Sequence, residues 1–583
     1  MTASDLEKGI KGDKRASSTF TLSSTLTSID EEHFESTNPL TKLSYWIKNQ
    51  CDSFKQAEGD AKVLHPQLSG FSLQMIAIGG SIGTGLFIGT GEALSQGGAA
   101  GLIICYTLTS FMIYFMVQSL AELACTFPVP GAFSYFASTF IDSSVGFAIS
   151  WNYAMQWLVL LPLELSAATM TFKFWNGFPI GDGYLISGFF IMIIAINMMP
   201  VKIYGYAEVV FSLTKVIAIF GFLIIALIVL FGGIEGQDAI LDKYWRDPGP
   251  FSDSGFKGIV AVFIISAFSF AGTEMCGLCA AETPRPNITI PKASKQVFWR
   301  ILFFYMSSLI LIGLLVPYNE PKLISKRDDT TSNSSPFVIA IQNANIPWLP
   351  SIMNVVILIS ILSVGNSAIY AASRTFVSLA EAGVAPHSLS YIDRNGRPLV
   401  AIGITLAFGT LAYVSLISGD AAHVLFTWLL SLSGLSSLFT WSSICFSLIR
   451  FRKAMKDQHR SLHELSFISI VGLPGAWFSF IFCIVVLIAQ LWIAISPIGS
   501  PPSFENFLKV YLGAFVIIFF FVAHKLYLFF TTGSFQFGYK ASDIDIISGR
   551  REKDIYDSGL VYQQIRDELS ARPWYYRTLK VWC

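Results

Sequence analysis

The stretch GGSIGTG, residues 79–85, decides the fold because it lies inside an apolar run and yet forms a helix poorly. Every residue in it except Ile82 is Gly, Ser or Thr, and each Gly in a helix costs about 1 kcal/mol relative to Ala. It is not a nucleotide loop, because Leu86 and Phe87 stand where a Walker motif requires Lys and Ser or Thr. Two interpretations remain. Small residues can pack closely against another helix, or a helix can break inside the membrane and aim free amide groups at an anion.

The composition of the whole chain points to a membrane protein. Of 583 residues, 53% are hydrophobic and only 13% are charged, whereas a soluble domain carries about 25% charged residues. Lipid must therefore cover much of the surface. The 39 basic and 39 acidic residues give no net charge, so no nucleic-acid partner is expected.

Apolar runs of about 20 residues, the length that spans a bilayer, begin after residue 70. Twelve are expected, near 73–95, 98–125, 145–172, 182–200, 206–233, 257–281, 297–317, 350–380, 398–418, 421–449, 471–496 and 507–531. An even number places both termini on one side. The chain opens without a cleavable signal, and the loops expected inside carry the larger share of Lys and Arg, so both termini are predicted to be cytosolic.

A second polar stretch, SAFSFAGTE at 266–274, lies in the middle of the sixth run. Interruptions in spans one and six predict a 5+5 inverted repeat of broken helices, with substrate at the midplane between the breaks. The expected fold is thus an all-α integral membrane protein with twelve transmembrane helices. Its parts are a largely disordered and candidate regulatory tail over 1–70, a core over 71–531 (repeats about 71–233 and 257–449, helices eleven and twelve about 471–531), and a cytosolic tail over 532–583.

Glu122, Glu164, Lys215 and Glu274 stand inside apolar runs, where a charged side chain costs about 2.5 to 3.5 kcal/mol at mid-bilayer. Glu122 lies near the inner end of its run, so the simple expectation is that it reaches the interface. Glu164 follows Pro162 and is expected to compensate for carbonyls that a proline kink frees. Lys215 and Glu274 lie deeper, and for them a functional role is the better hypothesis.

Longer motifs resemble the fungal amino-acid permeases of the amino acid–polyamine–organocation superfamily. They include LQMIAIGGSIGTGLFIG at 73–89, FSFAGTE at 268–274, IPKASKQVFWRI at 290–301, SVGNSAIYAASRT at 363–375 and SGLSSLFTWSSICFSLIRFR at 433–452. NYAMQWLVLLPLEL at 152–165 and KYWRDPGPF at 243–251 are similar to the broad-range, neutral-preferring branch. The resemblance implies a secondary active transporter rather than an enzyme, driven by a proton gradient, with no cofactor and no metal.

By this resemblance, the broken first helix holds the substrate carboxylate. The amides of Thr84 and Gly85 bind it, and Gly83 allows the close approach. The substrate ammonium is expected at the backbone carbonyls of Ser81, Phe268 and Ala271. Because the main chain holds the invariant part of an amino acid, such a site admits many side chains.

The side-chain pocket and the energy coupling follow from the same resemblance. Phe268 is expected to cover the substrate as a gate, while Phe270 and Thr273 shape the pocket. Glu274 is the candidate that couples binding to gating or protonation. Lys215 resembles a lysine that replaces a sodium ion in proton-driven relatives and braces the first helix near its break.

The expected function is import of several L-amino acids by proton symport with alternating access at the plasma membrane, after transit through the endoplasmic reticulum. An amino-acid-sensing receptor of the same fold is the alternative. The expected partners are the amino acid, protons, membrane lipid and ubiquitin-ligase machinery on the tails. Asn333 is a candidate for N-glycosylation, and the terminal Cys583 is a candidate for S-acylation.

Overall fold

The structure is a computed structural model, and its described residues form helices joined by turns, with no β-strand among them. Described are Met75 and residues 78–129, 131–175, 180–234, 238–278, 286–324, 335–342, 346–417, 421–499, 501–533 and 537–550. The helices belong to one compact unit, Val63–Ile392 with Gly396–Cys583. Of the other unit, Met1–Lys62 with Asp393–Asn395, the described part is a single turn in which the Asn395 amide donates to Asp393 (3.1 Å).

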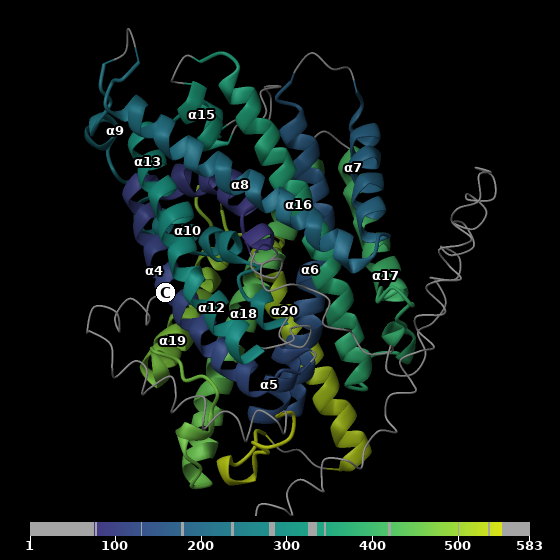
Figure 1. Ribbon diagram of the computed structural model, residues 1–583. Helices are drawn as coiled ribbons and strands as arrows, with labels where there is room; N and C mark the ends of the chain where they lie inside the picture. The colour runs from purple at the N-terminus through teal and green to yellow at the C-terminus, as the bar shows by residue number, and fades with distance from the viewer. Residues whose placement is uncertain are drawn as a thin grey trace, which may run out of the picture. The chain divides into compact units, whose positions relative to one another are not determined.

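Figure 1 labels most of the principal helices. Those up to the middle of the chain are η2 (Gly85–Gly89), α4 (Thr90–Thr126), α5 (Ala132–Phe140), α6 (Ser143–Phe172), α7 (Asp182–Asn197), α8 (Val201–Leu230), α9 (Lys243–Arg246), α10 (Gly255–Phe270) and α11 (Met275–Leu278). Those that follow are α12 (Pro286–Arg300), η3 (Ile301–Met306), α13 (Ser307–Leu315), α14 (Pro321–Ile324), α15 (Pro336–Gln342), α16 (Leu349–Glu381), η4 (His387–Ser390), α17 (Leu399–Gly409), η5 (Thr410–Leu416), α18 (Ala421–Asp457), η6 (Leu462–Glu464), α19 (Gly472–Ile495), α20 (Phe504–Thr532) and η7 (Ala541–Asp543).

Nine helical segments in the described part of the chain are long and apolar enough to cross a membrane. The first of them, Ile78–Thr126, contains two of the expected runs and bends at Gly98, whose φ of 73° favours glycine. Two shorter apolar helices, α7 and α10, cover two further runs. Helices therefore overlap all twelve expected runs, but the number of crossings and their arrangement as an inverted repeat stay predictions.

The distribution of side chains is that of a protein whose outer surface contacts lipid. In α20 only 11% of the most apolar window is buried, and Phe519 and Phe530 are 67% and 81% exposed. The interior, by contrast, contains many buried polar side chains, including Glu208, Lys215 and Glu274. An apolar exterior of this extent is unfavourable in water. The burial pattern therefore agrees with the membrane protein that the composition predicts.

The packing around the two polar stretches places them in the interior. Helix α10 packs along α4 and η2, and α6 packs along α16 and α18 (Figure 1). Helix α8 also packs against α16. The first helix (residues 78–89, which end with η2) therefore forms the interior together with α10, α6, α8 and α16.

The segment after α20 is held against the helices instead of leaving them. The amide of Gly538 and the ammonium of Lys525 both donate to Asp142 (2.9 and 2.8 Å), and Ile544 and Ile546 are buried. Burial raises the pKa of the Asp142 carboxyl, but hydrogen bonds from Lys525, Gly538 and Ser144 outweigh it, so the pKa lies below its usual value. The polar tail expected from residue 532 onward thus includes a packed segment at 537–550.

Candidate functional site

The first helix is interrupted inside the GGSIGTG stretch. Helical backbone over Ile78–Ser81 gives way to bends at Ile82 and Gly83. The chain then resumes as the π-helix η2, with Thr84 at the position before its first residue. The first amides of a helix have no partner within that helix, so this restart offers donors next to the interruption.

The second interruption follows α10. Helix α10 ends at Phe270, and a turn over residues 271–274 leads into α11. Gly272 in this turn has φ +91°, a left-handed conformation that a side chain would strain. Its amide donates to the Glu274 carboxylate (3.1 Å), which ties the turn to the buried acid.

The two interruptions lie directly against each other. A Cβ atom placed on Gly272 would lie 2.6 Å from the carbonyl oxygen of Gly80, and one placed on Gly85 would lie 2.5 Å from the Cα of Ser269. Glycine at both positions therefore permits the close approach of the two backbones. The eight predicted substrate residues lie in the two stretches that meet at this junction, and all eight residues are buried.

Tyr305 joins the two interrupted helices through its hydroxyl group. The hydroxyl lies 2.7 Å from the carbonyl oxygen of Ser81 and 2.9 Å from that of Ser269, and these two acceptors share its single proton. The Tyr305 ring stacks on Phe270 with centroids 4.5 Å apart. Sequence reasoning missed this residue, because Tyr305 lies in an ordinary apolar run and its acceptors are backbone atoms of distant segments.

Gly83, which is predicted to allow close approach of the substrate, lies against α16. A Cβ atom at Gly83 would lie 2.4 Å from Cγ2 of Val364, so the glycine permits contact between the first helix and α16. The predicted use of Gly83 for approach of a substrate stays a prediction, and the observed packing supplies an independent reason for glycine there.

The expectation that Glu164 compensates for backbone carbonyls freed by a kink at Pro162 is wrong. Its carboxylate accepts a hydrogen bond from the hydroxyl of Thr84, on the first helix, and its side chain is buried. The partner lies 80 residues away in the sequence. Glu164 therefore connects α6 to the restart of the first helix.

Lys215 is fully buried and contacts the first helix just before its interruption. Its ammonium donates to the carbonyl oxygen of Gly79 (2.6 Å) and to the hydroxyl of Ser363 on α16 (3.0 Å). This is the bracing position that the family resemblance implies for a lysine on this helix.

A buried carboxylate that sequence reasoning missed completes this cluster. Glu208 accepts hydrogen bonds from Ser363 (2.9 Å) and from Asn366 (2.8 Å), both on α16. Glu208 and Lys215 are seven residues apart on α8, and that spacing places them on one helix face. This spacing was the available signal, although Glu208 stands near the start of its apolar run.

Glu274 lies in the turn after α10 and has one satisfied and one unsatisfied oxygen. Its Oε2 accepts from the indole of Trp441 (3.2 Å) and from the Gly272 amide, whereas Oε1 is buried and has no hydrogen-bond partner among the residues that the structure describes. A buried acceptor without a partner is costly. Among the described residues, no cluster of three or more His, Cys, Asp or Glu is arranged to hold a metal ion.

Comparison with known proteins identifies the family. The family model described as amino acid permease matches residues 72–532. The chain belongs to this family. The permease is 48% identical to the amino-acid permease GAP5 of Candida albicans over 551 residues, which cover 94% of this chain and 86% of the relative.

Two general amino-acid permeases are similarly related. GAP2 of Candida albicans is 50% identical over 514 residues (88% of this chain, 86% of the relative). GAP1 of Saccharomyces cerevisiae is 48% identical over 519 residues (88% and 84%). The permease is therefore a multi-pass membrane protein that transports amino acids, and it is not an enzyme.

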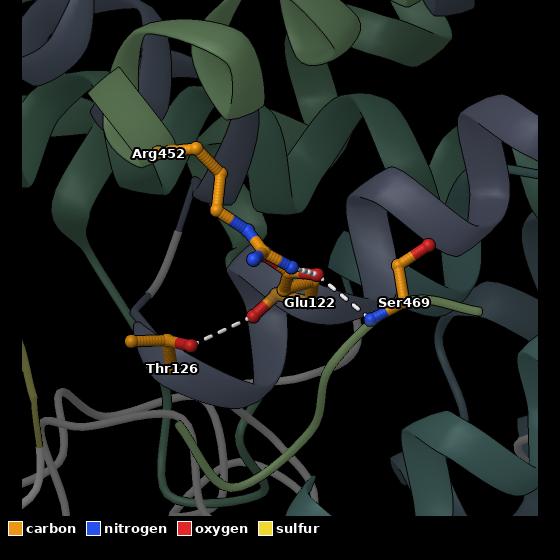
Figure 2. Close-up of polar contacts among 4 residues, drawn as sticks. All are labelled: Glu122, Thr126, Arg452 and Ser469. Carbon is orange, nitrogen blue, oxygen red and sulfur yellow. Dashed lines mark hydrogen bonds and ion pairs between the residues drawn. The ribbon is translucent and has the colours of Figure 1, made fainter. Parts of the chain in front are cut away.

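Away from the two interruptions, the permease contains a buried ion pair at Glu122. Figure 2 shows its carboxylate between Arg452 on α18 and Ser469 in the segment before α19. Arg452 donates from Nε (2.5 Å) and Nη2 (2.7 Å), and the Ser469 amide donates at 2.8 Å. Glu122 is fully buried, so the expectation that it reaches the interface is wrong.

The remaining predicted residues lie outside the described part of the permease. Asn333 and Cys583 belong to the segments 325–334 and 551–583, and the N-terminal tail over 1–70 is also outside it.

Proposed function

We propose that this permease imports several L-amino acids, with preference for neutral ones, by proton symport across the plasma membrane. The observation that carries the proposal is the contact between two interrupted helices, Gly80 to Gly272 and Gly85 to Ser269, in the buried interior. Backbone donors and acceptors exposed by such interruptions are suited to a ligand with one carboxylate and one ammonium.

The carboxylate of the substrate binds to the amides of Thr84 and Gly85, at the restart of the first helix. A helix N-terminus favours an anion through its free amides and its dipole. The Thr84 hydroxyl is already engaged by Glu164, so only the amide of Thr84 is assigned to substrate.

The ammonium binds to the carbonyl oxygens of Ser81, Phe268 and Ala271. The Ser81 carbonyl accepts from the Tyr305 hydroxyl, so an arriving ammonium competes with this donor or shares the oxygen with it. Phe268 covers the bound molecule, and Phe270 and Thr273 shape the space for its side chain. Since recognition uses the main chain, the site accepts several side chains, in keeping with two relatives that are named general permeases.

Proton coupling is assigned to Lys215 and Glu274, the former with its ammonium on the Gly79 carbonyl. Arrival and loss of the proton change the strength of that hydrogen bond, because charge-assisted bonds are about twice as strong as neutral ones. The hold on the first helix thereby controls the return of the empty site across the membrane, so accumulation depends on it, whereas the loaded permease still exchanges amino acid with its proton bound.

The proposed architecture has twelve crossings, ten of them in an inverted repeat (about 71–233 and 257–449) and two more over about 471–531. Both termini face the cytosol, so the tails over 1–70 and 532–583 are open to ubiquitin-ligase machinery. Glycosylation of Asn333 during transit through the endoplasmic reticulum and acylation of Cys583 complete the proposal. The same-fold receptor finds no support in the relatives, all three of which are named permeases.

Uptake of labelled amino acids in a fungal strain that lacks its own permeases tests the proposal. We expect saturable uptake that rises as the medium is acidified, concentrates substrate inside, and collapses with a protonophore. Competition by each of the twenty amino acids then defines the range, with neutral ones the strongest competitors. Uptake that never exceeds equilibration, or that ignores the protonophore, contradicts proton symport.

A further inference from the structure

We propose that Glu208 is the proton acceptor for Lys215, and that the Ser363 hydroxyl relays the proton between them. The inference rests on the proposed function, in which Lys215 takes part in proton coupling, and it adds the group with which the lysine exchanges its proton. It concerns a continuous line of hydrogen bonds from α8 to α16 and back to α8.

The direction of each hydrogen bond along this line suits proton transfer. The Lys215 ammonium donates to Ser363 Oγ (3.0 Å), and the Ser363 hydroxyl donates to Glu208 Oε2 (2.9 Å). A proton can leave Nζ for Oγ while the hydroxyl proton leaves Oγ for Oε2. The ammonium and carboxylate become an amine and a carboxylic acid, and Ser363 ends as it began, so atoms and charge balance.

The surroundings of Glu208 hold its carboxylate in place for this exchange. Its other oxygen, Oε1, accepts from Asn366 (2.8 Å), whose own side-chain oxygen accepts from Asn197 (2.6 Å). Gly79 makes room for the carboxylate, since a Cβ atom there would lie 2.6 Å from Glu208 Oε2. Glu208 is fully buried, so water does not compete for the proton in this conformation.

The charged groups that interact with Lys215 are both carboxylates, and a carboxylate can accept its proton. They are Glu208 on its own helix and Glu164 on α6, while Lys215 is the charged group that faces Glu208. Glu164 accepts from Thr84 at the proposed carboxylate site, whereas Glu208 lies behind the first helix beside Gly79. Lys215 therefore interacts electrostatically with one carboxylate that contacts the proposed substrate site and with another beside Gly79, and only Glu208 is linked to it through Ser363.

This placement explains how proton movement reaches the first helix. Lys215 holds the Gly79 carbonyl with a hydrogen bond of 2.6 Å while it is charged. When Glu208 takes the proton, that bond loses its charge assistance and weakens. The first helix is then freed three residues before its bend at Ile82.

Substitutions at both ends of the relay test the inference in membrane vesicles that contain the full chain. The probe is the labelled amino acid that the unaltered permease takes up fastest in a screen of the twenty. Two readouts are taken: exchange of internal for external probe without a gradient, and accumulation driven by an imposed gradient. One pH unit supports about tenfold accumulation per proton.

We expect Glu208→Gln and Ser363→Ala to keep exchange and to reduce accumulation from about tenfold to about onefold. Ser363→Thr retains a hydroxyl and should accumulate normally. Ser360→Ala is the matched control, because Ser360 is equally buried on α16 but donates only to its own helix, at Val356. If Glu208→Gln fails to reach the membrane, the comparison of Ala with Thr at Ser363 decides alone.

Two results would overturn the inference. One is normal accumulation, with an unchanged pH profile, in Ser363→Ala or in Glu208→Gln. The other is loss of exchange together with accumulation, since that loss marks a structural role. Lys215→Arg distinguishes failure of the relay from failure of the proposed function. If Lys215→Arg loses accumulation while Ser363→Ala keeps accumulation, only the relay through Ser363 fails. If Lys215→Arg itself accumulates normally, lysine coupling fails.

Discussion

The ammonium of Lys215 lies 2.6 Å from the carbonyl oxygen of Gly79 and donates a hydrogen bond to it. This contact joins α8 to the first helix immediately before its interruption. Two buried carboxylates, Glu208 and Glu164, interact electrostatically with the same ammonium. The proposed transport cycle depends on this relationship more than on any other in the permease.

Gly85→Val should abolish uptake. A Cβ atom at Gly85 would lie 2.5 Å from the Cα of Ser269, so the two interrupted helices could not keep their contact. The matched control is Gly221→Val on α8, where a Cβ atom would meet nothing within 4 Å. Uptake is measured in cells with equal surface levels of both variants. Normal uptake by Gly85→Val would place the site elsewhere.

Tyr305→Phe should destabilise the substrate-free permease by about 1 to 3 kcal/mol, because it leaves a buried acceptor without its donor. The variant keeps the ring that stacks on Phe270. Saturating amino acid should reduce the loss, since the substrate ammonium supplies a donor to the Ser81 carbonyl.

Thermal unfolding in detergent, with and without amino acid, measures this difference. Tyr511→Phe is the control, because its hydroxyl donates to the Leu487 carbonyl between α20 and α19 (3.2 Å), away from the junction. Tyr511→Phe should lower the stability against thermal unfolding by the same amount with and without amino acid. If Tyr305→Phe loses the same amount of stability with and without amino acid, the substrate ammonium does not bind at the Ser81 carbonyl.

Glu274→Gln should change the pH dependence of uptake. Within the described part of the chain one oxygen of this buried carboxylate has no hydrogen-bond partner, and a carboxamide can neither bind nor release a proton there. Initial rates over a range of external pH, at matched surface level, provide the measurement. A pH profile identical to that of the unaltered permease would assign Glu274 a purely structural role in the turn after α10.

Glu122→Leu should lower the free energy of unfolding by about 3 to 5 kcal/mol, because it leaves the buried Arg452 guanidinium without its counter-charge. The pair Glu122→Leu with Arg452→Met should recover most of that loss, since apolar residues of similar volume replace a buried ion pair without a stability penalty. Unfolding in detergent compares the three. Equal stability of the single and double variants would mean that the ion pair shown in Figure 2 is not formed.

The sequence alone predicts the helical membrane fold and the two polar stretches, because both follow from local chemistry. Apolar runs of bilayer length predict spans, and GGSIGTG forms a helix poorly wherever it lies. The all-helical class is confirmed for the described residues, and the first helix is interrupted within GGSIGTG, at Ile82 and Gly83. These features need no knowledge of distant contacts.

Contacts between distant segments could not be predicted in this way. Glu122 looked like an interfacial residue because its partner Arg452 lies 330 positions later in the chain. Glu164 looked like a companion of the nearby Pro162, whereas its partner is Thr84. Glu208 was missed altogether, because its acceptor role depends on Ser363 and Asn366, 155 and 158 positions away.

Proton-driven accumulation of a labelled amino acid by Lys215→Arg decides whether Lys215 couples transport to the proton. Arginine keeps the positive charge beside the Gly79 carbonyl but does not release its proton. The account predicts that this variant reaches the membrane and exchanges amino acid, yet accumulates it about onefold under a gradient that gives the unaltered permease about tenfold. Ordinary accumulation with an ordinary pH profile would contradict it.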